Sequence, residues 1–99
     1  MKVINPVLPG FNPDPSLVRV GDDYYIATST FEWFPGICIH HSKDLVNWEI
    51  LSYALTDETK FDIKGMDTAC GIWAPNLTYD NGTFYLIYTI VLKIPTILW

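Results

Sequence analysis

The sequence predicts an all-β protein built from short antiparallel strands, and three observations support this fold class. Aromatic and β-branched residues gather in short runs bounded by Gly, Pro, Asn and Asp, as in the run 24–30. No segment shows a sustained apolar period of 3.6 residues, which an amphipathic helix requires. The segment 14–29 also matches the segment 74–89 without a gap, so the chain contains an internal repeat at an offset of 60 positions. Four short strands per repeat are typical of a β-propeller blade, which predicts one blade and the beginning of a second.

The first repeat contains the four predicted strands of this blade, at 16–20, 24–30, 37–41 and 48–51. The first two form a hairpin around the turn residues Gly21-Asp22-Asp23, and the third follows the turn dipeptide Pro35-Gly36. A long polar connection is expected from Ser52 to Asp67, after which the pattern restarts. Because propellers have about 4 to 8 blades, one and a half blades predict an incomplete ring.

Composition and charge exclude several classes of protein. Of the 99 residues, 49% are hydrophobic and 15% aromatic, which is ample for a packed core. The net charge of -5 and the lack of a basic cluster argue against a nucleic-acid partner. No stretch approaches the ~18 to 20 apolar residues of a membrane span, and the N-terminus has no export signal, so we expect a cytoplasmic protein without a membrane partner. Cys38 and Cys70 are then expected to be reduced and buried.

The stretch Phe11-Asn12-Pro13-Asp14-Pro15-Ser16 is predicted to be a rigid loop that presents one carboxylate, that of Asp14. The two prolines fix φ at their own positions, and Pro15 is expected to hold Asp14 in extended geometry. A hydrophobic strand follows at once, so the carboxylate lies at the mouth of a strand, where catalytic groups are common. Asn12 and Asp14 are equally typical of an ordinary turn beside prolines, and the loop by itself leaves both interpretations open.

Four motifs in the same order resemble the N-terminal part of the glycoside hydrolase family 43 β-xylosidases, over about residues 4–89. They are GFNPDPS at 10–16, YYIATSTFEWFPG at 24–36, HHSKDLVNW at 40–48 and GIWAP at 71–75. The resemblance ends where the family commonly carries an aspartate after Tyr88-Thr89, since this chain has Ile90. Residues 1–89 are therefore interpreted as the N-terminal part of the catalytic domain, and residues 90–99 as an apolar tail outside the family pattern.

The resemblance implies a five-bladed β-propeller that hydrolyses xylosides or arabinofuranosides with inversion, using three acidic residues from different blades. Asp14 matches the general base, and Phe31, Trp73 and Ala74 match positions that line the pocket for the terminal sugar. The orienting aspartate and the glutamate general acid would lie beyond the end of this chain. The implied partners are a xylo-oligosaccharide or arabinoside substrate and the remaining blades, and no cofactor is implied.

Inverting hydrolysis needs one carboxylate to deprotonate water and a carboxylic acid to protonate the leaving oxygen, about 6.5–9.5 Å apart, so Asp14 supplies half of this mechanism. The rings of Phe31 and Trp73 suit the apolar face of a sugar, and core burial is the alternative. The place of Trp73 in the motif at 71–75 favours the sugar pocket, and Phe31 is favoured slightly less. Glu32 is a conceivable acid partner for Asp14, but nothing in the sequence fixes their distance, and we expect a solvated loop residue.

Cys38 and His40 fall on one face of a predicted strand, as two metal ligands would. A third ligand is not evident, so a structural cysteine beside a polar histidine is expected and no metal site is predicted. Two functions remain for the chain as a whole. It is the base-carrying part of a glycosidase, or it is a non-catalytic β module or sugar-binding remnant that is inactive without the missing blades.

Overall fold

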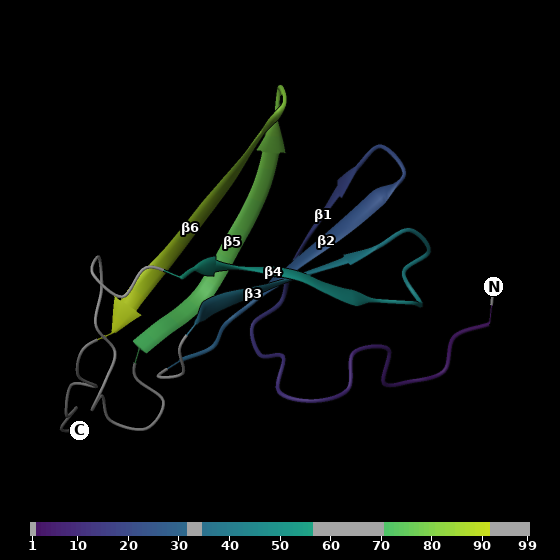
Figure 1. The fold of residues 1–99 in the computed structure, drawn as a ribbon, viewed down its shortest axis with the longest axis horizontal. Coiled ribbons are helices and arrows are strands. Elements are labelled where there is room, and N and C mark those ends of the chain that lie inside the picture. The colour runs from purple at the N-terminus through teal and green to yellow at the C-terminus, as the bar shows by residue number, and fades with distance from the viewer. Residues whose placement is uncertain (1, 32–34, 57–70, 92–99) are drawn as a thin grey trace, which may run out of the picture.

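The computed structural model describes residues 2–31, 35–56 and 71–91 (Figure 1). The regular elements that these residues form are all strands, which confirms the all-β prediction. Among the described residues there is accordingly no helix that could span a membrane. The strands are β1 (Ser16–Val20), β2 (Asp23–Thr28), β3 (Gly36–Ser42), β4 (Glu49–Leu55), β5 (Gly71–Asp80) and β6 (Thr83–Val91).

Strands β1 to β4 form one antiparallel sheet in chain order, as expected of a propeller blade. The turn between β1 and β2 has Gly21 at a φ of 61°, a left-handed conformation that glycine adopts without steric cost. The fourth strand continues to Leu55, so the prediction of a polar connection starting at Ser52 is wrong at its beginning. Gly36 and Cys38 of β3 pair with Leu55 and Tyr53 of β4. This pairing extends β4 beyond Ser52, although Ser52 is polar. The rest of that connection, from residue 57, lies outside the described residues.

Strands β5 and β6 form a hairpin whose register repeats that of the first hairpin. Ser16 pairs with Ala27, and sixty positions further on Asn76 pairs with Ile87. The same offset relates every later pair, up to Val20 with Asp23 and Asp80 with Thr83. The sequence repeat therefore corresponds to a structural repeat, and the hairpin is the start of a second blade.

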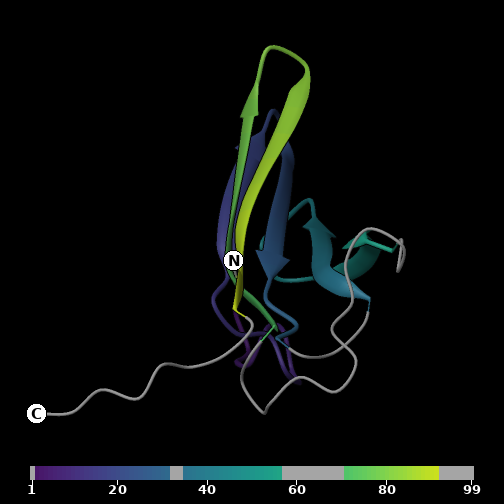
Figure 2. The same cartoon turned by 90° about the vertical axis from the view of Figure 1, so that its left-hand side faces the viewer.

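The hydrophobic core lies between the first sheet and the β5–β6 hairpin. Viewed from the side, the hairpin forms a second layer over β1 and β2 (Figure 2). The core residues come from three strands, and they are Ala27, Ile37, Ile72 and Leu77. Strand alternation places Ile37 and Ile39 of β3 toward this core, while Cys38 and His40 face the opposite side of the sheet.

The opposite side of the first sheet carries a cavity of about 400 Å³ beneath the N-terminal residues 7–12. His40 and Thr28 line it, and both are buried. Neither the His40 ring nitrogens nor the Thr28 hydroxyl has a hydrogen-bond partner among the described residues. Buried polar groups are nearly always hydrogen-bonded, so these atoms are exceptions within the described part of the chain.

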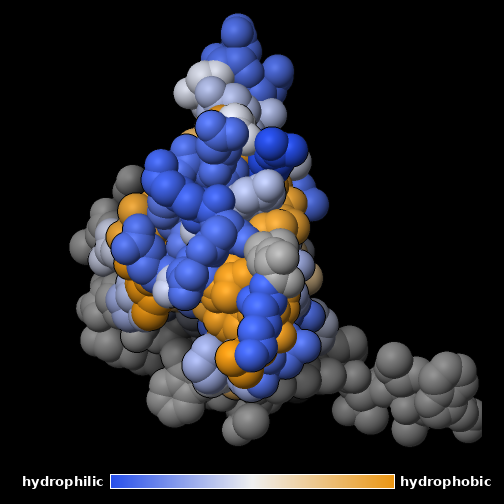
Figure 3. All heavy atoms as spheres, turned by 90° about the vertical axis from the view of Figure 1, so that its right-hand side faces the viewer, coloured by the Kyte–Doolittle hydropathy of each residue, from blue (hydrophilic) through white to orange (hydrophobic). Residues whose placement is uncertain are grey.

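Charged and polar side chains gather at the turn ends of the strands, with apolar patches between them (Figure 3). His41 lies in this region between two carboxylates, with Nε2 2.7 Å from Asp23 Oδ1 and Nδ1 3.1 Å from Glu49 Oε1. The hydrogen bond to Asp23, and secondarily that to Glu49, raises the pKa of His41 above its ordinary value of 6.5. The hydrogen bond to His41 lowers the pKa of Asp23 below 3.8.

The His41 contribution to stability is thus complete below pH 6.5 and is lost as the pH rises through the raised pKa. The Asp23 contribution is present above pH 3.8 and is lost as the pH falls through the lowered pKa.

We expect an NMR titration of the His41 imidazole to give a pKa above 6.5, and Asp23→Asn to lower it more than Glu49→Gln does. The reason is that the bond to Asp23 is the shorter of the two and the larger cause of the shift. His41→Gln assigns the resonance. Equal effects of the two substitutions, or none, would show that these carboxylates do not set the ionisation of His41.

Candidate active site

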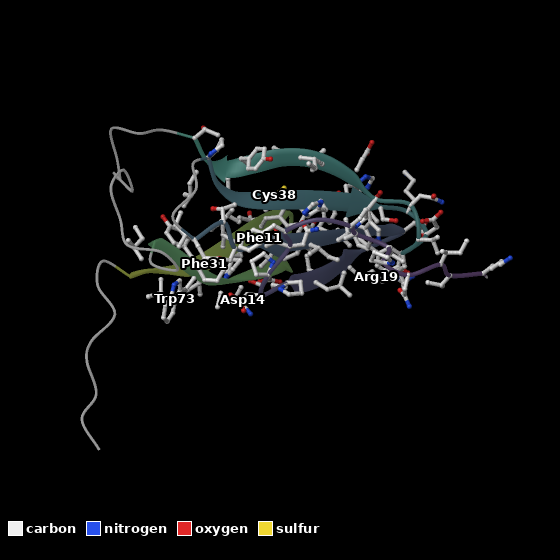
Figure 4. All side chains as sticks on the ribbon, turned by 90° about the horizontal axis from the view of Figure 1, so that it is seen from below. Phe11, Asp14, Arg19, Phe31, Cys38 and Trp73 are labelled. Carbon is white, nitrogen blue, oxygen red and sulfur yellow. The ribbon has the colours of Figure 1, made fainter. Side chains whose placement is uncertain are left out.

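The predicted site residues come from three segments that meet at one end of the two hairpins. Asp14 precedes β1, Phe31 follows β2, and Trp73 and Ala74 lie near the start of β5. Both hairpin turns lie at the other end (Figure 1). Seen from below, Asp14, Phe31 and Trp73 lie in the same region of the molecule (Figure 4). The structure therefore places Asp14 and Trp73 at the same end of the sheets, as the repeat predicts.

Backbone hydrogen bonds fix these segments to one another. The Ser29 N–H donates to the Pro13 carbonyl at 3.0 Å, which ties the segment before Asp14 to the end of β2. Phe31 and Ile72 exchange two backbone bonds, at 3.2 and 2.9 Å, which tie the end of β2 to β5. Asp14 and Trp73 thus each follow a residue that is held in this network.

Asp14 lies on a β-bulge, and this bulge recurs in the second blade. If the Ser16–Ala27 register continued, Ser29 would face Asp14, but its N–H bonds to Pro13 instead. The β5–β6 hairpin shifts its register in the same way between Trp73 and Asn76. Asp14 and Ala74 are therefore equivalent extra residues on neighbouring blades. Bulges re-aim side chains and are common beside active sites.

The expected extended geometry of Asp14 is wrong, because its φ is 50°. The bulge inserts a residue before β1, and an aspartate enters the left-handed region more easily than most residues. This conformation overrides the preference that Pro15 imposes on the preceding residue. The Asp14 side chain is exposed, and no described residue forms a hydrogen bond or ion pair with its carboxylate.

Phe31 and Ala74 share the positive φ of Asp14, with values of 48° and 34°. Such conformations cost on the order of 1–3 kcal/mol each in non-glycine residues and persist only where the surroundings enforce them. Three of the four predicted site residues thus have backbones that the fold holds in a disfavoured state. Ile37, Leu45 and Asn81 have positive φ as well, so this conformation is not confined to the candidate site.

The aromatic part of the site includes one residue that the sequence reasoning did not select. Phe31 is half-buried, and the ring of Phe11 lies 5.9 Å from it at an angle of 52°. Phe11 is itself exposed, so the two rings form an edge beside the Asp14 loop. Its position in the same motif as Asp14 was the available signal. Trp73 is half-buried on β5, and Ala74 is exposed beside it.

Cys38 and His40 lie on one face of β3, as predicted. Burial raises the pKa of the Cys38 thiol, against the smaller opposing effect of its hydrogen bond with the Tyr53 hydroxyl. A neutral thiol is a poor metal ligand, since metals bind the thiolate. No group of three or more metal-binding side chains occurs within the described ranges. Cys38 is a free, buried thiol as expected, whereas Cys70 and Glu32 lie outside the described residues.

The motif at 40–48 has a structural explanation at the turn end of the blade. The Asp44 carboxylate accepts hydrogen bonds from the backbone of Val46 and Asn47, at 2.9 and 2.7 Å, and from the Ser42 hydroxyl. These bonds, those of Asn47 first, hold the pKa of Asp44 far below its usual range. The Trp48 indole N–H donates to the Leu45 carbonyl and closes the turn. This part of the family pattern shapes a loop distant from Asp14.

The blade and the repeated hairpin define the chain as part of a β-propeller protein. It matches the family model described as glycosyl hydrolases family 43 over residues 3–96. The chain belongs to this family of glycosidases.

The similarity to individual relatives is high, but it covers a small part of them. The chain is 59% identical over 88 residues to xylosidase/arabinosidase 43B of Humicola insolens, which covers 89% of this chain and 16% of the relative. It is 61% identical over 89 residues to a β-xylosidase of Bacillus subtilis, covering 90% and 17%. The crystal structure of a xylan β-1,4-xylosidase from Bacillus halodurans superposes with a TM-score of 0.89 at 62% identity, covering 94% of this chain and 18% of that one. The chain therefore spans less than a fifth of the length of these relatives.

Proposed function

We propose that the chain supplies the general base and part of the terminal-sugar pocket of an inverting glycosidase that cleaves β-xylosidic or α-L-arabinofuranosidic bonds. The observation that carries the proposal is the Asp14 bulge. It presents an exposed carboxylate at the same end of the blades as Phe31, Trp73 and Ala74. The names of the relatives, which are xylosidases and arabinosidases, support the substrate class.

In this mechanism Asp14 accepts a proton from the water that attacks the anomeric carbon. A carboxylic acid on the other side of the sugar protonates the leaving oxygen, about 6.5–9.5 Å from the base. The rings of Phe31 and Trp73 pack against the sugar and fix its orientation relative to that water. The acid and the orienting aspartate come from blades that follow this chain.

The second candidate is a non-catalytic module, and the repeat provides the observation that favours it. The bulge equivalent to that of Asp14 carries Ala74, so the second blade brings no carboxylate to the corresponding position. Within the described residues the site thus contains one half of an acid–base pair. A module that binds a sugar without cleaving it fits this inventory.

The decisive experiment measures the release of xylose and arabinose from aryl glycosides by three preparations. These are the 99-residue chain, the chain mixed with the remaining blades, and a completed enzyme in which residues 1–89 replace the matching segment of the Bacillus halodurans xylosidase. The glycosidase proposal expects turnover by the completed enzyme with inverted anomeric configuration, followed by NMR. Retention of configuration, or a completed enzyme that binds the sugar without cleaving it, would contradict it.

A further inference from the structure

We propose that Ser29 is a positioning residue for the sugar pocket, an inference that rests on the proposed function. Ser29 is 1% exposed and is the residue through which three site segments are joined. Its backbone N–H donates to the Pro13 carbonyl at 3.0 Å. Its hydroxyl donates to the Ile72 carbonyl and accepts from the Phe31 N–H at 3.2 Å.

Each partner of Ser29 adjoins or is a residue of the site. Pro13 precedes Asp14, Ile72 precedes Trp73, and Phe31 is bonded directly. A change of the Ser29 side chain therefore acts on Phe31 directly and on Trp73 through Ile72, whereas the backbone bond to Pro13 remains. This makes it a residue that acts through others.

The left-handed backbones of Asp14 and Phe31 give this network a specific task. Residues held at a φ near +50° return to ordinary conformations unless neighbouring bonds over-determine them. The Phe31–Ile72 backbone pair remains when the Ser29 hydroxyl is removed, so we expect the fold to survive. What is lost is the bond from the Phe31 N–H to the Ser29 hydroxyl and the bond from that hydroxyl to the Ile72 carbonyl.

The repeat places a second hydroxyl residue at the position equivalent to Ser29. Thr89 occupies the position equivalent to Ser29 in the second hairpin, where it pairs with Trp73. A serine or threonine is accordingly expected to serve at position 29.

Ser16 offers a matched control, because it also makes a bond between the two blades. The Leu77 N–H donates to the Ser16 hydroxyl at 3.0 Å, further along β5 from Trp73. Ser16→Ala and Ser29→Ala each remove one serine hydroxyl from the same interface. Only the second removes a bond to the residues of the pocket.

The test compares Ser29→Ala, Ser29→Thr and Ser16→Ala in the completed enzyme. Small misplacements of reacting groups cost up to about 100-fold in rate, so we expect Ser29→Ala to lower kcat/KM by about 10- to 100-fold, with a raised KM. Ser29→Thr should stay within about threefold of the parent, and Ser16→Ala should keep the parent KM. Amide exchange gives a readout that needs no turnover, and it should accelerate at Phe31, whose N–H loses the Ser29 acceptor, in Ser29→Ala only.

The outcomes separate this inference from the proposed function. An inactive parent enzyme would refute the glycosidase proposal, while the amide exchange would still decide the role of Ser29. A Ser29→Ala enzyme with unchanged KM and unchanged exchange at Phe31 would overturn the positioning role, as would equal effects of Ser29→Ala and Ser16→Ala. Should Ser29→Ala not fold, Ser29→Cys keeps the size but replaces the hydroxyl by a weak donor, and a parent-like KM would then refute the inference.

Discussion

Asp14→Asn in the completed enzyme is expected to lower kcat by about 10²- to 10⁴-fold, the range that general acid–base catalysis contributes. The substitution keeps the size of the side chain but removes the group that accepts the proton from water. Asparagine also tolerates the left-handed conformation that Asp14 adopts, with its φ of 50°, so the bulge should persist. Steady-state kinetics on an aryl xyloside, with circular dichroism and thermal unfolding of both proteins, measure the effect.

Asp22→Asn provides the matched control for this experiment. Asp22 is an exposed aspartate in the turn between β1 and β2, at the end of the hairpin away from the site. Its substitution makes the same change of charge and should leave kcat unchanged. Near-normal turnover by Asp14→Asn would show that Asp14 is only a turn residue beside two prolines.

The repeat shows why much of this fold was predictable from the sequence. The match of 14–29 with 74–89 predicted that a second blade follows the first and that the Asp14 and Ala74 loops are equivalent. The observed registers of the two hairpins agree pair by pair. The signal is strong because side chains alternate between faces along a strand, and a slip of one residue would expose the core. The four-stranded first blade follows from that pattern, whereas the site residues were implied by the family resemblance.

The bulge and the Ser29 network were not predictable in the same way. Local rules for a residue before proline favour an extended Asp14, and the left-handed conformation arises from pairing with a distant strand. Ser29 reads as an ordinary polar strand residue until the sheet brings Ile72 beside it. Tertiary hydrogen bonds determine both features, and the sequence of a single strand contains no signal for such bonds. The division of the chain at residue 89 stays a prediction, as do the roles of Asp14, Phe31, Trp73 and Ala74.

The 99-residue chain by itself is expected to be catalytically silent and to associate in solution. Silence is expected because the proposed mechanism takes its general acid from another blade, and without that acid the leaving oxygen is not protonated. Association follows from surfaces that further blades would cover. Ile87 and Tyr85 on the outer face of β6 are 70% and 52% exposed, and Leu17 and Ile50 are exposed on the first sheet. Open strand edges beside such patches pair with other chains.

Size-exclusion chromatography with light scattering, combined with the xyloside assay, tests both halves of this prediction. A chain that ends at residue 91 is the matched control, since it removes the apolar sequence 92–99 and keeps every described strand. If the uncovered blade faces drive association, the shortened chain also elutes as a broad, oligomeric species. Adding the remaining blades should then convert it to a defined complex, because they would cover the exposed apolar residues of β6 and of the first sheet. A sharp monomer peak with cooperative unfolding would refute the incomplete-ring argument. Xyloside cleavage by the chain alone would mean that it contains its own general acid, and Glu32 would be the first residue to substitute.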